Sequence, residues 1–231
     1  MNRSSVYLKC NSEAIDKLQQ GNAAEASKIL RVALSHLQAE LGAMRKENQH
    51  LYKSHSSYTY GSIYGVSIES NLESTLLKSP DNLFSFYFRA FEVDENAQEC
   101  LNLSTAFVVL IYNLALSMLF EVASRGQISR TELQTIIHMF QTAMRAANVL
   151  WDQGGYEDEL LCLALGITTN LGYLHCFAQD AKQARDHLVL AVDLVGHPSA
   201  EDAVPLEDYE FFYNSTCMFS SGVALNAAPA A

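Results

Sequence analysis

The sequence has 231 residues, of which 49% are hydrophobic and 18% are charged, so it can bury a sizeable core and does not have the composition of a disordered chain. Its formal net charge of −11 repels phosphate backbones, which argues against nucleic acid as the main ligand. The longest uninterrupted apolar run, AFVVLIY, ends at Asn113, well short of the roughly 20 residues that span a membrane.

The N-terminus lacks the apolar core of a signal peptide, and the five cysteines form no C-x-x-C pair. An odd number of cysteines without such a pair is typical of reduced thiols. We therefore expect a cytoplasmic or nuclear protein with no transmembrane segment.

The first 48 residues have the pattern of two helices joined by a turn. The first helix is expected over residues 4–20, the dipeptide GN forms the turn, and the second helix runs from residue 23 to about 48. Small and bulky apolar residues alternate along one face of the second helix. This predicts an N-terminal helical hairpin over residues 1–48.

The helical pattern fails over residues 49–103. The stretches YTYGSIYGVSIES and NLFSFYFRAFEV are rich in aromatic and β-branched residues, and SPDN between them has turn chemistry. Two interpretations remain open, a short β-hairpin or extended segments that plug the helical stack. A flexible linker is not expected, because it would leave many aromatic side chains exposed.

A middle helical hairpin is expected over residues 104–155. Its first helix covers residues 105–120, and its second follows a capping box formed by Ser129 and Glu132 and runs to Trp151. The dipeptide GG then ends the hairpin.

Another hairpin is expected over residues 156–199. Asp180 can cap its second helix, and a glycine and a proline after residue 195 mark the end of that helix. Residues 200–231 are expected to form a C-terminal capping helix and a tail. All five segments together are expected to form one domain.

Gly172 lies in the middle of an expected helix over residues 160–177, where glycine costs about 1 kcal/mol relative to alanine. The next helix carries Ala184 and Ala191 on its inner face. We interpret the glycine as a point of close approach, where the van der Waals gain offsets the lower helix propensity.

The run NLGYLHCFAQDAKQARDHLVLA resembles a tetratricopeptide repeat, in which a small residue in the first helix precedes an alanine, a bulky residue and an alanine in the second. The residues at those spacings are Leu171, Gly172, Ala184, Leu188 and Ala191. GNAAEASKILRVAL resembles the turn and second helix of another repeat, and YNLAL fits a third with a longer loop. The resemblance implies a mainly α fold of stacked antiparallel helical hairpins, an α-solenoid, acting as a non-catalytic scaffold.

In tetratricopeptide repeats the first helices line a concave groove that binds peptides. Carried over, this resemblance places eight partner-binding residues in the groove: Tyr112, Asn113, Leu116, Leu119, Thr169, Asn170, Tyr173 and Phe177. Asparagine can pair with a peptide main chain, and tyrosine adds a rigid apolar body with a polar tip. Alternatively, Asn113 and Asn170 satisfy polar groups within the stack. A carboxylate clamp is not expected, because these two helices carry no lysine or arginine.

No catalytic or metal-binding pattern is found. The phosphate-binding glycine motifs and G-x-S-x-G do not occur, and no H-E-x-x-H frames the histidines. His175 and Cys176 are neighbours, so on a helix they point about 100° apart and lack a third partner. We expect no cofactor. Two alternatives stay open: an enzyme or enzyme subunit with a site at the aromatic insertion, or an obligate structural subunit of a complex.

Acidic residues are concentrated between residues 150 and 210. This region contains twelve of them and only two basic residues, Lys182 and Arg185. This region is either a solubilising surface or a surface that attracts a partner. The sequence therefore predicts a protein or peptide partner, and neither nucleic acid nor a membrane. The second interpretation of the acidic region gives that partner a basic segment.

Overall fold

The computed structural model describes residues 4–47, 63–68, 86–93, 103–152 and 157–220. Its helices and strands are α1 (Ser4–Gln19), α2 (Ala23–Glu47), β1 (Ile63–Ser67), β2 (Arg89–Val93), α3 (Leu103–Ser124), α4 (Arg130–Asp152), α5 (Glu157–Phe177), α6 (Ala181–Val195), α7 (Ala200–Ala203) and α8 (Leu206–Ser220). The prediction of a mainly α protein is thus confirmed, and the insertion contributes a small antiparallel pair of strands. The short helix α7 was not expected from the sequence.

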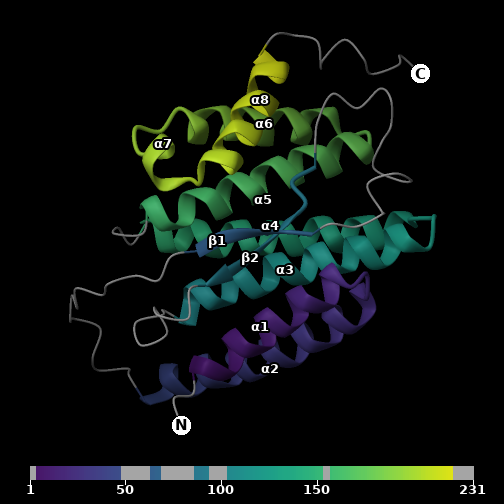
Figure 1. Ribbon diagram of the computed structural model, residues 1–231, viewed down its shortest axis with the longest axis vertical. Helices are drawn as coiled ribbons and strands as arrows, with labels where there is room; N and C mark the ends of the chain where they lie inside the picture. Colours follow the sequence, from purple (N-terminus) through teal and green to yellow (C-terminus); the bar gives the residue numbers. More distant parts are fainter. Residues whose placement is uncertain (1–3, 48–62, 69–85, 94–102, 153–156, 221–231) are drawn as a thin grey trace.

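The helices pack in chain order. α1 packs on α2, α2 on α3, α3 on α4, α4 on α5 and α5 on α6, and α8 closes against α6. Figure 1 shows this order as a stack that rises from α1 and α2 to α7 and α8. Each hairpin buries its apolar stripe against the next one, which is why single amphipathic helices of this length are stable here.

The two most apolar helices form the centre of this stack. Leu103–Ser124 and Leu160–Phe177 are long and apolar enough to cross a membrane, but 83% and 89% of their most apolar windows are buried inside the fold. Counting uninterrupted apolar runs overlooked both segments, because polar residues such as Asn113 and Asn170 interrupt them. Burial on several sides explains their composition, as in the core helices of soluble proteins.

The N-termini of α4 and α6 are capped by the residues that the sequence predicts. Ser129 and Glu132 make a reciprocal capping box, with the Ser129 N–H donating to Glu132 Oε2 at 3.0 Å and the Glu132 N–H donating to Ser129 Oγ at 3.2 Å. Asp180 caps α6 by accepting from the Gln183 N–H at 3.2 Å. The GG dipeptide expected to end α4 lies outside the described residues.

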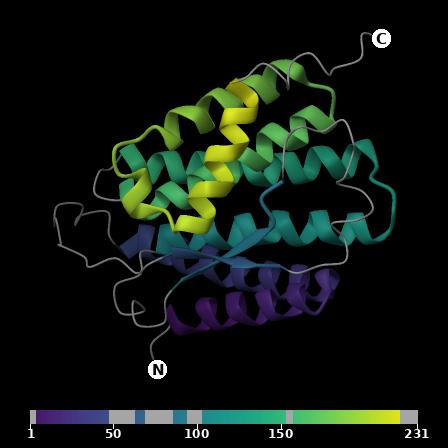
Figure 2. The same cartoon turned by 45° about the horizontal axis from the view of Figure 1, so that its top comes forward.

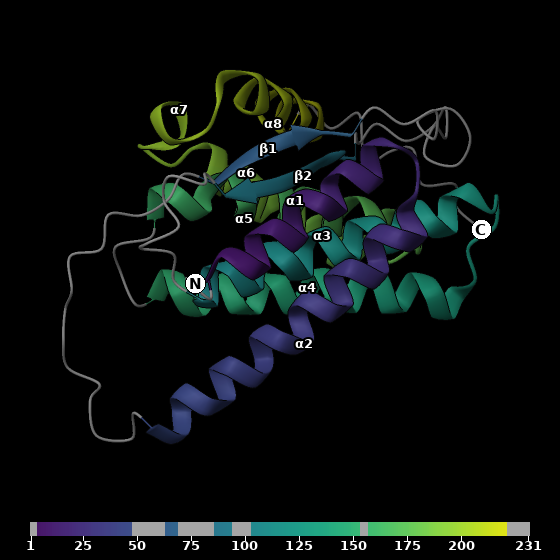
Figure 3. The ribbon, with the colours of Figure 1, turned by 60° about the horizontal axis from the view of Figure 1, so that its bottom comes forward.

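The two strands pair in antiparallel register, from Ile63 opposite Val93 to Ser67 opposite Arg89. The Ile68 N–H donates to the Phe88 carbonyl at 3.3 Å, which extends the pairing beyond β2. Figures 2 and 3 show the hairpin lying along the helical stack, with α1 on one side of it and α8 on the other. We call residues 86–93, which include β2, the groove segment.

Candidate functional site

The groove segment lies against the first helix of each of the three hairpins. α1 and α3 contact β2, and the main chain of Phe91 is held by one asparagine from each of these helices. Asn113 on α3 accepts from the Phe91 N–H at 2.8 Å and donates to the Phe91 carbonyl at 2.7 Å. Asn11 on α1 donates to the same carbonyl at 2.9 Å and accepts from Asn113 at 2.7 Å.

α5 holds the other end of the segment in the same way. Asn170 accepts from the Tyr87 N–H at 2.8 Å and donates to the Tyr87 carbonyl at 3.2 Å. The Tyr112 hydroxyl accepts from Asn170 at 3.0 Å and donates to the Arg89 carbonyl at 3.2 Å. We call these four side chains, from Asn11, Tyr112, Asn113 and Asn170, the main-chain clamp.

The clamp contacts alternate residues of the groove segment, namely Tyr87, Arg89 and Phe91. In a strand, the N–H and carbonyl groups of successive residues point to opposite edges. The main-chain groups of the intervening residues, Phe88 and Ala90, therefore point to the other edge, toward β1. Phe88 shows this alternation, since its carbonyl accepts from Ile68. The clamp therefore takes the place of a neighbouring strand and satisfies buried groups that would be costly without partners.

Two aromatic rings of the segment fit against a glycine on α5. A Cβ atom added to Gly166 would lie 3.1 Å from both Tyr87 Cδ1 and Phe91 Cε2, closer than ordinary van der Waals contact. Tyr87 and Phe91 are 2% and 0% exposed, and Phe91 packs edge-on against Tyr112. Gly166 thus gives the segment the space that a side chain would occupy.

α8 covers the outer side of the segment. Its Phe212 packs on Tyr87 with ring centroids 4.7 Å apart. Arg89 Nε lies 3.1 Å from Oδ1 of the buried Asp208, and Arg89 also pairs with exposed Glu207 at 2.8 Å. Burial raises the pKa of Asp208 above its ordinary value, although Tyr87 and Arg89 lower it in part. The arginine therefore links the segment to the last helix.

The structure corrects the expectation of an open groove. The eight residues predicted to bind a partner do lie on α3 and α5, but seven of them are buried: Tyr112, Asn113, Leu116, Leu119, Thr169, Asn170 and Tyr173. Four of them contact residues 86–93 of the aromatic insertion, namely Tyr112, Asn113, Asn170 and Tyr173. Of the two interpretations of the asparagines, the internal one describes their contacts here. Of the insertion, residues 63–67 and 89–93 pair as antiparallel strands and residues 86–93 lie against the helices, while the expected SPDN turn lies outside the described residues.

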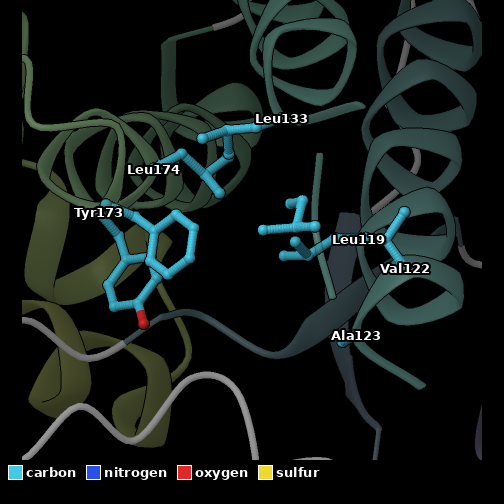
Figure 4. Close-up of a pocket in the computed structure, with 8 residues that line it drawn as sticks. Leu119, Val122, Ala123, Leu133, Tyr173 and Leu174 are labelled. Atoms are coloured by element: carbon cyan, nitrogen blue, oxygen red, sulfur yellow. The ribbon is translucent and has the colours of Figure 1, made fainter. Parts of the chain in front are cut away.

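One end of the groove stays open. Leu119, Tyr173 and Phe177 line a shallow apolar pocket with a cavity volume of about 20 Å³. Its other lining residues are Val122 and Ala123 at the end of α3, Ile128 and Leu133 at the start of α4, and Leu174 on α5. Figure 4 shows side chains from α3, α4 and α5 arranged around this space. Phe177 is 38% exposed at its rim, and Tyr173 forms its inner wall by packing on Phe86 at 5.5 Å. We call this space the open pocket.

The pKa of the cysteine thiol buried beneath the groove segment is shifted in the direction that makes it less nucleophilic. Burial raises the pKa of the Cys162 thiol, which lies beneath Tyr87, to about 12, so it is not a nucleophile at neutral pH. Among the described residues, four cysteines are free and no group of three or more histidine, cysteine or acidic side chains could hold a metal. The contacts of the site in the described residues are main-chain hydrogen bonds and ring packing.

Sequence reasoning missed Asn11, Gly166, Arg89 and Asp208. A signal was present for Asn11, which lies in an otherwise apolar stripe with Leu8, as Asn113 and Asn170 do in theirs. Gly166 is one helical turn before Asn170, another visible hint. No local pattern could pair Arg89 with Asp208, since they are far apart in the sequence.

Comparisons with known proteins add no relative to this picture. No family model matches the chain, and no curated protein and no solved structure matches it either.

Proposed function

We propose that this chain is a non-catalytic helical-repeat scaffold, with its hairpins stacked as in tetratricopeptide repeats, and that it binds a protein partner in the cytoplasm or nucleus. The observation that supports the proposal is the open pocket, which continues a groove that is otherwise filled. It is built from predicted groove residues of two successive first helices, Leu119 on α3 and Tyr173 and Phe177 on α5.

The shallow pocket and its rim offer an apolar surface against which one side chain of the partner can pack. Its walls are aliphatic and aromatic, and its rim residue Phe177 is partly exposed. Burial of a leucine or phenylalanine side chain there would contribute roughly 1.5–3 kcal/mol, the size of an interface anchor. Tyr173 is unsuited as a probe of binding because it is buried against Phe86, whereas Phe177 can be truncated with little effect on the core.

A basic segment beside this anchor would meet acidic side chains. Asp180 is exposed three residues after Phe177, and α6 and α8 expose further acids, among them Asp186, Asp193 and Glu210. Charge complementarity acts mainly on the association rate and is screened by salt, since the Debye length falls from about 10 Å at 0.1 M to about 3 Å at 1 M. The on-rate should therefore fall with salt, while the anchor controls the off-rate.

Affinity capture with the full chain, followed by surface-binding kinetics with the purified partner, tests the proposal. Phe177→Ala should raise the off-rate by about tenfold, which corresponds to about 1.4 kcal/mol. The matched control is Tyr213→Ala on α8, an exposed aromatic residue away from the pocket, which should leave the off-rate unchanged. Equal off-rates for both variants would exclude the open pocket as the binding site.

A further inference from the structure

We infer that the filled part of the groove is itself a binding site for a strand, that residues 86–93 occupy it as a built-in ligand, and that it accepts in their place an extended partner segment with the pattern aromatic–x–basic–x–aromatic. This inference extends the proposed function from the open pocket to the rest of the groove. It rests on contacts that separate cleanly into main-chain and side-chain recognition.

Apart from the ring of Tyr112, which packs on Phe91, the main-chain clamp contacts only the main chain of the segment. Its contacts go to the N–H and carbonyl of Tyr87 and Phe91 and to the carbonyl of Arg89. Any extended chain offers the same groups at positions i, i+2 and i+4, so the clamp requires only the strand conformation. The first and last contacts are four residues apart, which corresponds to about 13 Å along a strand.

Three positions of the segment define the pattern proposed for a partner, and Phe86 and Phe88 add ring contacts with Tyr173 and Phe120. The rings of residues i and i+4, here Tyr87 and Phe91, share the space left by Gly166. The residue between them, here Arg89, reaches two carboxylates of α8. Buried Asp208 needs a cation opposite it, since an unpaired buried charge is costly. Together these contacts specify two aromatic residues around a basic one, in agreement with the acidic surface nearby.

The tethered segment must be displaced before another strand can enter. A segment joined to its groove through the chain competes at an effective concentration in the millimolar range. The apparent affinity for a free strand falls by the fraction of molecules whose groove is empty. Phe86, at the start of the segment, packs on Tyr173, which also lines the open pocket. A partner strand that continues from the groove into this pocket would therefore make additional contacts, and these would help it to compete with the tethered segment.

The test uses a fluorescent peptide with the sequence of residues 85–94, SFYFRAFEVD, and the full chain. Phe91→Ala weakens the tethered segment and leaves the clamp intact, so it should bind the peptide at least tenfold more tightly than the wild-type chain does, as measured by anisotropy. A peptide in which both Tyr87 and Phe91 are replaced by alanine should not bind. Asn170→Ala combined with Phe91→Ala should abolish binding of the original peptide.

Arg89→Gln is the second variant that weakens the segment, and it keeps the experiment decisive if Phe91→Ala does not fold. The peptide should raise the melting temperature of either variant and not that of the wild type. Equal affinity for wild type and both variants, or for both peptides, would overturn the inference. So would a wild-type dimer in light scattering, which would assign the groove to a second copy. The Phe177→Ala result does not affect these outcomes.

Discussion

The two faces of α5 show two different ways in which a helix accepts a close neighbour. Toward α6 it presents Gly172, where an added Cβ atom would lie 3.0 Å from Leu188. Toward the groove it presents Gly166, beside the rings of the groove segment, and Asn170, which binds the main chain of that segment. The first face has only a missing side chain, whereas the second has a missing side chain and a buried amide.

The difference follows from what each neighbour brings. A helix satisfies its own main-chain hydrogen bonds, so α6 needs only space and van der Waals contact. A strand brings unpaired N–H and carbonyl groups at its edge, which need polar partners when they are buried. A buried asparagine in an apolar helical stripe therefore indicates a neighbouring strand, and a lone glycine indicates a neighbouring helix.

The largest effect is expected when the groove segment loses one of the asparagine side chains that bind its main chain, here Asn113 on α3. Asn113→Ala leaves the buried Phe91 N–H without its acceptor and removes the partner of Asn11. Each unsatisfied buried group costs about 1–3 kcal/mol, so the free energy of unfolding should fall by about 2–5 kcal/mol. Urea denaturation measures this. Asn214→Ala, at an exposed position of α8, should change stability by less than about 0.5 kcal/mol.

The next largest effect is expected from a larger side chain on the face of α5 that contacts α6. Gly172→Leu must push Leu188 away and should lower the free energy of unfolding by about 1–3 kcal/mol, despite the better helix propensity of leucine. Gly42→Leu on α2, where no atom lies within 4 Å of an added Cβ, is the control and should be neutral or stabilising. If thermal melting shows both variants to be equally stable, close packing does not explain Gly172.

A smaller effect is expected at Gly166. In Gly166→Ala the new methyl group meets three ring atoms at 3.1–3.2 Å, while the helix gains about 1 kcal/mol of propensity. Because the rings of Tyr87 and Phe91 are fully enclosed, we expect a net loss of about 0.5–1 kcal/mol in urea denaturation. Gly42→Ala should instead stabilise the chain, and the same gain at Gly166 would mean that the rings can move aside.

A pH response of the α6-contacting face alone should be similar in size to the effect at Gly166. His187 on α6 stacks on His175 of α5 with centroids 5.4 Å apart. Burial, together with His175, lowers the pKa of His187 to about 4. The unfolded chain takes up this proton near pH 6.5, before the folded chain does, so stability falls as the pH drops from about 6.5 to 4.

Because the ring is half-buried and partly screened, the expected loss between pH 7 and pH 5 is about 1 kcal/mol, or 2–4 °C in melting temperature. His187→Gln should reduce this pH response, whereas His138→Gln, at an exposed position of α4, should preserve it. A pH response that is identical in the two variants would assign it to other groups.

The helical part of the fold could be predicted because its determinants are local. Apolar spacing, the Ser129 capping box and the Asp180 cap each act within a few residues. The site could be predicted only in part. Asn113 on α3 and Asn170 on α5 were predicted to face a partner, but they bind residues 86–93, which Asn11 and Asp208, far away in the chain, also hold in place. Such pairing leaves no periodic signal in a single sequence.

The groove segment also determines how the chain can fold. Phe91 is bound by Asn11, 80 residues before it, Tyr87 by Asn170, 83 residues after it, and Arg89 by Glu207, 118 residues after it. During synthesis the segment emerges from the ribosome before α5 and α8, so its aromatic rings stay exposed to solvent until these helices have been made. Arrays of repeats with only neighbouring contacts can unfold piecewise, but here one strand ties the first helix to the last. We expect a single unfolding transition, with a folding rate limited by these long-range contacts rather than by helix formation.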